Sequence, residues 1–375
     1  MPTPAPAPPP PSATAGVLTL LALRPDARAH EHASHRDVAQ RLAVLLRRRF
    51  QELAPEGVAG ARELGYVVPD DTLVTLQAAH RFGIRTEADF FGGVVPSAYV
   101  ATKAITHPLV ASGALAPAGW APDFAECIKG HVLPGFTAFG HADARDAARR
   151  LLHDGPVRLK PAGGIGGCGQ IVAADLDAVD AALAALAAEE IGQGLVLEHD
   201  LAEIRTFSVG MVSVPGLRIS YVGTQRATRN RRGEAVYGGS SLEAVRGGLD
   251  ALAARTEPAE RLAIEQARIY HEAALACFPG LLASRCNYDV AAGHDAAGRP
   301  HAGVLEQSWR IGGASGAEVA ALEVFAGDPS CTVVRTSTWE VHGADAAVPG
   351  DAIVSFAGVD EELGPVTKYT RVETP

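Results

Sequence analysis

Apolar positions in the first hundred residues alternate between the periods of strands and helices. The run 16–23 is apolar and of strand length, and 36–53 places apolar residues at helical spacing. A second strand is predicted at 66–69, followed by a helix over 70–79 that begins at an aspartate. This alternation is typical of a small open α/β domain, which we assign to residues 16–104.

Strands outnumber helices in the rest of the chain. A polar turn or a glycine separates most of the apolar runs, and Asp175 is placed to cap one helix. The predicted strands are 157–160, 170–173, 195–198, 204–214, 217–225, 284–291 and 302–310, and the predicted helices are 143–153, 176–190 and 257–277. The basic, glycine-rich segment 226–241 is predicted to be an exposed loop. The expected fold class is therefore α/β, with α+β lobes after the first domain.

Composition narrows the class of protein. The chain has 375 residues, 47% of them hydrophobic, and a formal net charge of -10, so nucleic acid and anionic membrane are not expected as partners. No apolar run reaches membrane length. Residues 1–15 are predicted to form a disordered Pro/Ala tail, and five scattered cysteines without a CxxC pair favour the cytoplasm.

A glycine-rich loop carries the strongest chemical signal. Five of the seven residues at 163–169 are glycine, and the loop directly follows a strand that ends in Lys160. The glycines are Gly163, Gly164, Gly166, Gly167 and Gly169. Glycine allows backbone N–H groups to crowd around phosphate oxygens. A strand rather than a helix follows, and no Gly-Lys-Ser/Thr ends the loop, so we predict a hairpin flap instead of a Rossmann or Walker A loop.

Two late strands each carry three polar side chains on one face. They are Arg285, Asn287 and Asp289 on the first strand, and Glu306, Ser308 and Arg310 on the second. Pairing the strands through their turn brings two carboxylates together beside basic groups. Carboxylates completed by phosphate oxygens are a usual way to hold Mg²⁺ at a nucleotide, and Arg310 would then offset charge on a transferring phosphoryl group. The alternative is a solvated sheet face with ordinary ion pairs.

In order along the chain, these motifs resemble the ATP-grasp superfamily over about residues 100–330. The matching features are Lys160 before a glycine flap, a strand ending in Glu198 with Glu203 after it, Asp289 closing a short strand, and the Glu-x-Asn-x-Arg-like strand 306–310. The nearest group is an uncharacterised bacterial family that is loosely labelled biotin-carboxylase-like. The resemblance implies an ATP-grasp module over 105–375, with a lid lobe at about 130–198 and a C-terminal lobe at about 199–375, and ATP between them.

The resemblance also implies a role for each matched residue. The phosphates under the flap glycines would be contacted by Lys160 and by Lys103, or otherwise Lys129. Glu198 would meet adenine, and Glu203 would meet ribose. Asp289, Glu306 and Ser308 would hold Mg²⁺, while Arg310, Lys160 and Arg205 would act on the phosphoryl group. Ser308 departs from the family, which has asparagine there. The stretch 311–315 lacks the acidic residue of biotin carboxylases, so biotin carboxylation is not expected.

The function implied is a Mg-ATP-dependent ligase. It would activate a small-molecule carboxylate as an acyl phosphate for attack by an amine or similar nucleophile. The alternatives are a small-molecule kinase on the same scaffold and a nucleotide-binding protein that has lost catalysis, of which Ser308 would be the sign. Arg226, Arg229 and Arg231 would grip the substrate carboxylate, and a homodimer is compatible with the chain.

One further cluster has metal-like ligands. His30, Glu31, His32 and His35 follow one another closely near the amino terminus. The cluster lies in a polar segment ahead of the predicted helix, and a surface loop is the favoured interpretation.

Overall fold

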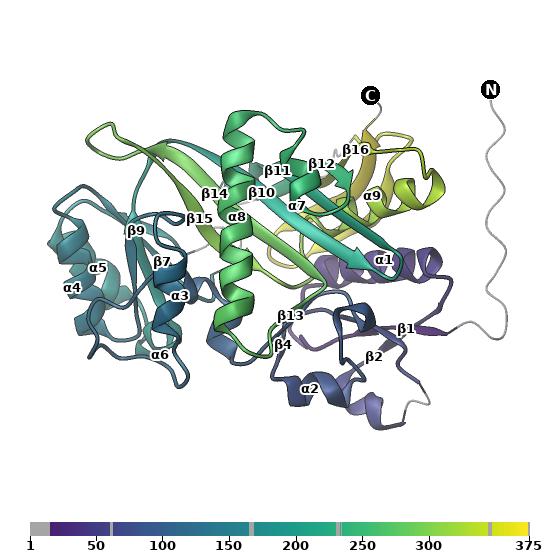
Figure 1. Cartoon of the computed structure of the whole chain (residues 1–375), viewed down its shortest axis with the longest axis horizontal. Coiled ribbons are helices and arrows are strands. Elements are labelled where there is room, and N and C mark those ends of the chain that lie inside the picture. Colours follow the sequence, from purple (N-terminus) through teal and green to yellow (C-terminus); the bar gives the residue numbers. More distant parts are fainter. Residues whose placement is uncertain are drawn as a thin grey trace.

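The computed structural model describes residues 16–60, 63–164, 169–229, 233, 235–343 and 347–373. The predicted tail at 1–15 lies outside these residues. Figure 1 shows three regions: a lid at the left, the amino-terminal region at the lower right, and a large sheet that runs between them.

The amino-terminal region contains a three-stranded parallel sheet with a long helix packed on it. Strand β1 (Val17–Leu21) pairs with β2 (Arg49–Leu53) on one side and with β3 (Tyr66–Pro69) on the other. Helix α1 (Ala29–Leu45) buries its apolar stripe, including Leu42, against β1 and β3. This is the open α/β arrangement that the sequence predicts.

The helix predicted at 36–53 is wrong at both ends. It begins seven residues earlier, at Ala29, and ends at Leu45, because Arg47 has a left-handed φ of 54° and the chain then turns into β2. Phe50 is therefore a strand residue, since pairing with β1 outweighs the local helical spacing. The histidine cluster lies in the first two turns of α1 rather than in a surface loop.

The helix predicted over 70–79 is also displaced. Asp70 accepts hydrogen bonds from the backbone N–H groups of Leu23 and Arg24 (2.7 and 3.4 Å), so it fixes the loop after β1 instead of capping a helix. The elements that follow are β4 (Leu73–Val74), α2 (Leu76–Arg81), capped by Thr75, and β5 (Gly93–Val95). The short helical turns 98–101 and 103–106 then carry the chain toward the lid.

The lid is a four-stranded antiparallel sheet of order β6-β9-β7-β8 with helices packed on it. Its elements, with helix α3 (Pro122–Cys127) before them, are β6 (Gly135–Ala138), α4 (His141–Leu151), β7 (Val157–Pro161), β8 (Ile171–Ala173), α5 (Leu176–Ala185), α6 (Ala188–Gln193) and β9 (Leu195–His199). Asp175 caps α5 by accepting a hydrogen bond from Ala178 N (2.8 Å), as predicted. The predicted helix 176–190 is two helices, because Leu186 is extended.

The large sheet has eight antiparallel strands in the order β15-β14-β10-β11-β12-β16-β18-β17. Its strands are β10 (Ala202–Val214), β11 (Leu217–Arg229), β12 (Ala235–Arg246), β14 (Arg285–His294), β15 (Pro300–Ser308), β16 (Val333–His342), β17 (Ile353–Asp360) and β18 (Gly364–Glu373). The loop predicted at 226–241 is instead mostly the paired ends of β11 and β12.

Helices cover both faces of the large sheet. Helix α8 (Pro258–Cys277), with α7 (Leu249–Ala253), packs on one face, and α9 (Ser315–Gly327), together with α1, packs on the other (Figure 1). Strand β13 (Leu282–Ala283) pairs with β5, which joins the amino-terminal region to the large sheet. The two faces of the sheet therefore belong to two separate apolar cores.

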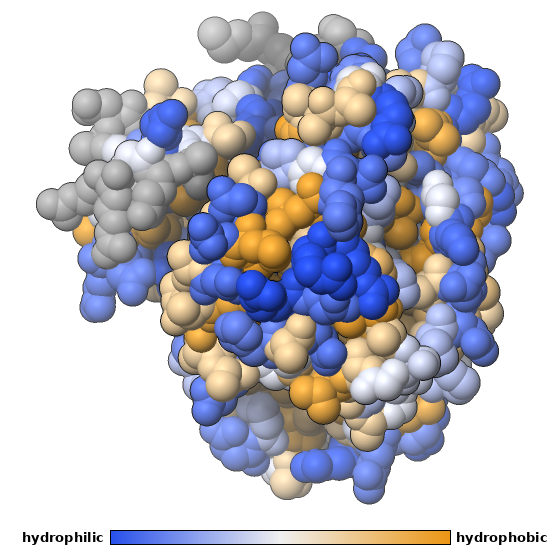
Figure 2. Space-filling model, turned by 90° about the vertical axis from the view of Figure 1, so that its left-hand side faces the viewer, coloured by the Kyte–Doolittle hydropathy of each residue, from blue (hydrophilic) through white to orange (hydrophobic). Residues whose placement is uncertain are grey.

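No helix among the described residues has the length and apolar content that a membrane span requires. The face of the molecule on the lid side is mainly hydrophilic, with apolar residues interspersed (Figure 2).

Candidate active site

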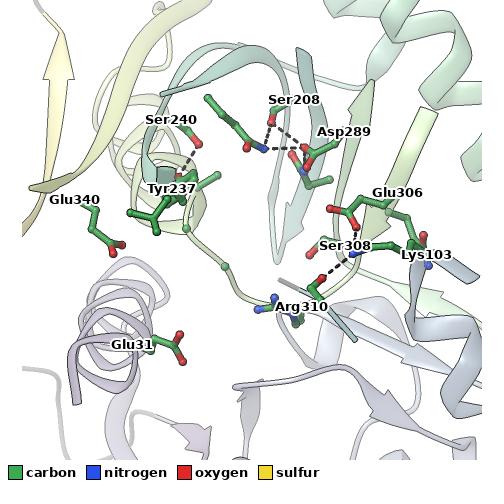
Figure 3. A pocket seen from close by; sticks show the side chains of 18 of the residues that line it. Glu31, Lys103, Ser208, Tyr237, Ser240, Asp289, Glu306, Ser308, Arg310 and Glu340 are labelled. Atoms are coloured by element: carbon green, nitrogen blue, oxygen red, sulfur yellow. Dashed lines mark hydrogen bonds and ion pairs between the residues drawn. The ribbon is translucent and has the colours of Figure 1, made fainter. Parts of the chain in front are cut away.

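One large cavity, of about 1260 Å³, lies between the lid, the amino-terminal region and the large sheet. We call its two parts the lid end (Lys103, Lys160, Glu198, Asp289 and Glu306) and the helix end (His30, Glu31, His35, Trp339 and Glu340). Figure 3 shows Glu306 and Lys103 on one side of the cavity, Glu31 and Glu340 on the other, and Arg310 between them.

The two predicted carboxylates face each other on neighbouring strands. Asp289 of β14 is the register partner of Glu306 of β15. The Oδ1 atom of Asp289 accepts hydrogen bonds from Ser208 Oγ (3.1 Å), Gln225 Nε2 (2.9 Å) and Asn287 Nδ2 (3.0 Å). Burial raises the pKa of Asp289, and the negative charge of Glu306 raises it further. A cation between these two side chains would relieve their repulsion.

Lys103 contacts both the start of the glycine loop and strand β15. Its ammonium lies 2.9 Å from Glu306 Oε2 and donates a hydrogen bond to the carbonyl oxygen of Gly164 (2.6 Å). The alternative, Lys129, has a side chain that is 77% exposed and pairs with Glu126. Of the two lysines, the structure therefore brings Lys103 into the cavity.

Lys160 is held by a buried carboxylate. Its Nζ lies 2.5 Å from Glu198 Oε1, and His107 Nε2 lies 3.2 Å from Glu198 Oε2. Burial alone would raise the pKa of Glu198, but the ammonium of Lys160 and the hydrogen bond from His107 outweigh it and hold the pKa below its usual range. The carboxylate expected to meet adenine is thus engaged with a lysine, and the next residue, His199, also lines the cavity.

The glycine loop connects two strands that form a hairpin, as predicted. Strands β7 and β8 pair in antiparallel fashion on either side of it. Gly163, Gly164 and Gly169 line the cavity, and Gly169 has a φ of 74° that favours glycine. Gly166 and Gly167 lie outside the described residues.

A buried ion pair fixes the end of β15. Arg285 and Glu318 lie 2.7 Å apart, and both are almost wholly buried. Arg285 Nη1 donates to the carbonyl oxygens of Ser308 (3.2 Å) and Arg310 (2.7 Å), and to Ser308 Oγ (3.3 Å). Arg310, predicted to lie on the strand, comes two residues after its end. Glu318 is the member of this network that carried no sequence signal.

An asparagine does reach the carboxylate cluster, but from the neighbouring strand. Asn287 is the register partner of Ser308, and it is Ser308 that occupies the position where the family pattern has asparagine. Its amide oxygen accepts a hydrogen bond from Tyr221 Oη (3.0 Å), and its amide nitrogen donates to Asp289. Asn287 therefore orients Asp289.

Two predicted residues do not reach the cavity. The side chain of Glu203 is 83% exposed and lies 3.5 Å from His294. Arg205 is exposed, and its guanidinium lies 5.3 Å from the centre of the Phe207 ring. Strand β10 turns Thr206 toward the cavity, and the alternation of side chains sends Arg205 to the other face.

Among the described residues, the arginines predicted to bind the substrate carboxylate do not form such a site. Arg226 stacks 3.8 Å from the centre of the Trp339 ring and donates to the carbonyl oxygen of Thr338 (2.5 Å). Arg229 donates to the carbonyl oxygen of Gly233 (2.6 Å), and Arg231 lies outside the described residues. Arg226 thus belongs to the packing of the sheet.

A family model described as "Protein of unknown function (DUF3182)" matches residues 18–370. A search of curated proteins finds no match.

Solved structures share the fold at low identity. A biotin carboxylase–β,γ-ATP complex from Campylobacter jejuni is 11% identical (TM-score 0.50), over 95% of this chain and 87% of that chain. A phosphoribosylamine–glycine ligase from Thermotoga maritima is 14% identical (TM-score 0.51), over 95% and 93%. The biotin carboxylase domain dimer of a Hydrogenobacter thermophilus 2-oxoglutarate carboxylase, in complex with MgADP, ADP and bicarbonate, is 12% identical (TM-score 0.52), over 95% and 86%. The chain therefore has the ATP-grasp fold, as its motifs predict.

Proposed function

The chain belongs to the DUF3182 family, and we propose that it is a Mg-ATP-dependent ligase that activates a small-molecule carboxylate as an acyl phosphate. One observation carries the proposal: Lys103 touches both the base of the flap and Glu306, whose strand partner is Asp289. A phosphate-covering loop and a pair of carboxylates, far apart in the sequence, meet at one ammonium group.

ATP would bind at the lid end. Lys103 and Lys160 supply positive charge from two different elements, and Gly163, Gly164 and Gly169 line the cavity, where glycine lets the backbone approach phosphate oxygens closely. Glu198 holds Lys160 in place, so the lysine loses little conformational freedom when the nucleotide binds.

The residues fit Mg²⁺. Within the described residues, no group of three or more His, Cys, Asp or Glu side chains is placed to hold a metal ion alone. Asp289 and Glu306 supply two carboxylates, and among the described residues neither Asp289 Oδ2 nor Glu306 Oε1 has a hydrogen-bond partner. Mg²⁺ is commonly held by one or two carboxylates plus substrate phosphates. When bound, the ion would neutralise charge on the phosphates.

Arg310 would act where the acid meets ATP. Its guanidinium donates to the carbonyl oxygen of Ile311 (3.1 Å) and lies 4.0 Å from Asp71, which leaves donors for a substrate. An oxygen of the acid attacks the γ-phosphorus, the bond from that phosphorus to the β,γ-bridging oxygen breaks, and ADP leaves. A nucleophilic nitrogen then attacks the acyl carbon, loses a proton and displaces phosphate. Arg310 stabilises the negative charge of the first step.

The test uses the full chain with ATP, MgCl₂ and a panel of carboxylic acids. We expect acid-dependent release of ADP, and we expect hydroxylamine to trap an acyl hydroxamate. ADP release with a phosphorylated hydroxyl compound and no hydroxamate would favour the kinase. Tight ATP binding without ADP release under any acceptor would favour a non-catalytic binding protein. Either result would overturn the ligase.

A further inference from the structure

The helix end of the cavity is walled by elements that are distant in sequence. Helix α1 forms one wall, and β16 and β18 form the wall across from it. Figure 3 shows Glu31 on α1 and Glu340 on β16 directed into the space between, with Tyr237 and Ser240 beside them. Arg310 stands where this space meets the lid end.

Charged side chains at the helix end already form ion pairs with side chains of opposite charge. The pairs are Arg24 with Glu31 (2.9 Å), Arg28 with Glu362 (2.5 Å) and Lys368 with Glu340 (2.8 Å). A ligand that placed another full charge here would have to displace one of these partners. The matched charges therefore favour a ligand whose body is uncharged.

Two imidazoles of α1 are buried at the helix end, and among the described residues they have ring nitrogens without a hydrogen-bond partner. His30 is 3% exposed and His35 is 7% exposed. Among the described residues, neither nitrogen of His30 has a hydrogen-bond partner, nor does His35 Nδ1. The nearest carboxylate oxygen to His30 Nε2, on Asp360, lies 3.7 Å away. Buried polar groups are normally satisfied, and both residues line the cavity, so we infer that their partner is a ligand at the helix end.

The imidazoles are neutral at physiological pH. Burial, together with the charge of Arg310, lowers the pKa of His35 to about 3, and burial also lowers the pKa of His30. A neutral imidazole presents one N–H donor and one acceptor nitrogen. It therefore suits hydroxyl or amide groups better than a carboxylate or an ammonium.

Further side chains at this end have the same character. Ser34 and Thr370, which carry hydroxyl groups, line this part of the cavity, as do the aromatic residues Tyr237, Trp339 and Tyr369. Burial raises the pKa of Tyr237 to about 12, so its hydroxyl is neutral too. Aromatic side chains beside neutral donors and acceptors match molecules that have both polar and apolar surface.

We propose that the helix end binds the body of the acid substrate, and that this body is uncharged and rich in hydroxyl or amide groups that hydrogen-bond to His30 and His35. The carboxylate of the substrate then points to Arg310 and the lid end. The inference rests on the proposed ligase function, which requires an acid at this cavity.

Acid binding is measured by isothermal titration of the full chain without nucleotide. The probes are D-gluconate, with a hydroxyl-rich body, and N-acetylglycylglycine, with an amide-rich body. Hexanoate, 6-aminohexanoate and citrate present apolar, cationic and anionic bodies for comparison. We expect gluconate or the acetylated dipeptide to bind at least about tenfold more tightly than all three, and the preferred probe distinguishes hydroxyl from amide recognition.

Histidine variants connect that preference to the two imidazoles. We expect His30→Leu and His35→Leu each to weaken the preferred probe about tenfold or more, and His35→Gln, which retains hydrogen-bonding groups, to recover most of the affinity. His141→Leu, at an exposed position of α4, is the matched control and should bind as wild type does. Thermal unfolding by circular dichroism verifies that each variant is folded.

Equal or tighter binding of hexanoate, 6-aminohexanoate or citrate would overturn the inference, as would folded leucine variants with unchanged affinity. Failure of both polar probes to bind would overturn it too. Because the titration contains no ATP, these results are separate from failure of the ligase proposal, which would show as absent ADP release.

Discussion

The two ends of the cavity use opposite kinds of chemistry. At the lid end, charged side chains contact one another across elements, as Lys103 does with Glu306 and Lys160 with Glu198. At the helix end, the charges are paired, and among the described residues the buried imidazoles of His30 and His35 have nitrogens without partners, as His107 and His199 do near Glu198 at the lid end. A highly charged ligand fits the first end and an uncharged polar ligand fits the second.

The difference has an energetic basis. Buried charges are expensive to desolvate, and a buried ion pair seldom stabilises a fold more than apolar packing would. Lys160 and Glu198 are 4% and 2% exposed. Such groups are typical of functional sites, where the ligand changes their partners. The sharpest experiments therefore remove one charge at a time.

The largest effect is expected for Glu306→Gln. The substitution keeps the shape of the side chain but removes one of the two carboxylates and the partner of Lys103. Since bound metal provides several kcal/mol of stabilisation in the transition state, we expect ADP release to fall at least about 1000-fold. ADP release is measured at saturating ATP over a range of MgCl₂ concentrations.

Glu243→Gln is the matched control for this experiment, because Glu243 pairs with Arg335 on the surface of the sheet. It should retain wild-type turnover. A Glu306→Gln variant with wild-type turnover would show that the lid end does not hold the metal.

The second prediction concerns Lys160→Met. It leaves Glu198 buried with only His107 as its partner, and we expect unfolding free energy to fall by about 3 kcal/mol and ATP affinity to weaken. Adding Glu198→Gln should recover much of the stability but none of the ATP affinity. Urea unfolding and ATP titration are compared for both single variants and the double variant.

Arg145→Met is the control, because it breaks an exposed ion pair with Asp180 and should cost little. Were the double variant to regain wild-type ATP affinity, Lys160 would be a structural residue and not a nucleotide ligand.

The lid end could be predicted from sequence because its signals are local. A lysine, five glycines and a returning strand follow one another directly, and the period of two fixes which residues of β14 and β15 share a face. Arg205 was assigned from the family resemblance instead, and the same alternation places it on the opposite face of β10 from Thr206 and Ser208. A register irregularity between Ala202 and Arg205 lies at that point.

The helix end could not be predicted because the histidine cluster marks only one of its walls and no local pattern links it to the other. His30 and His35 belong to α1, while Trp339 and Glu340 belong to β16, about 300 residues later. Only the packing of α1 beside β17 and β18 brings these residues to one cavity. Glu318 was not predicted for the same reason, because it contacts Arg285 only through the packing of α9 on the sheet.

The third and smallest predicted effect concerns His35, a neutral imidazole of the helix end, and the pH dependence of the unfolding free energy. The unfolded chain binds a proton at His35 with a pKa of 6.5, whereas the folded chain does so only at about 3. Between these values the unfolded state holds one more proton, so unfolding free energy falls as the pH falls, by about 1.4 kcal/mol per pH unit. The positive charges of Arg310, Arg24 and Lys368 oppose protonation of His35 in the folded state.

His35→Gln removes this contribution and retains a polar side chain of similar reach. Urea unfolding of both proteins at pH 7 and pH 5 should show wild type losing about 2 kcal/mol more than the variant, because His35 contributes only below pH 6.5. His30 is present in both proteins, so its own depressed pKa cancels from the difference. Parallel curves would mean that His35 takes up a proton in the folded protein as readily as in the unfolded chain. The helix end would then carry a titrating cation, and the contrast with the lid end would fail.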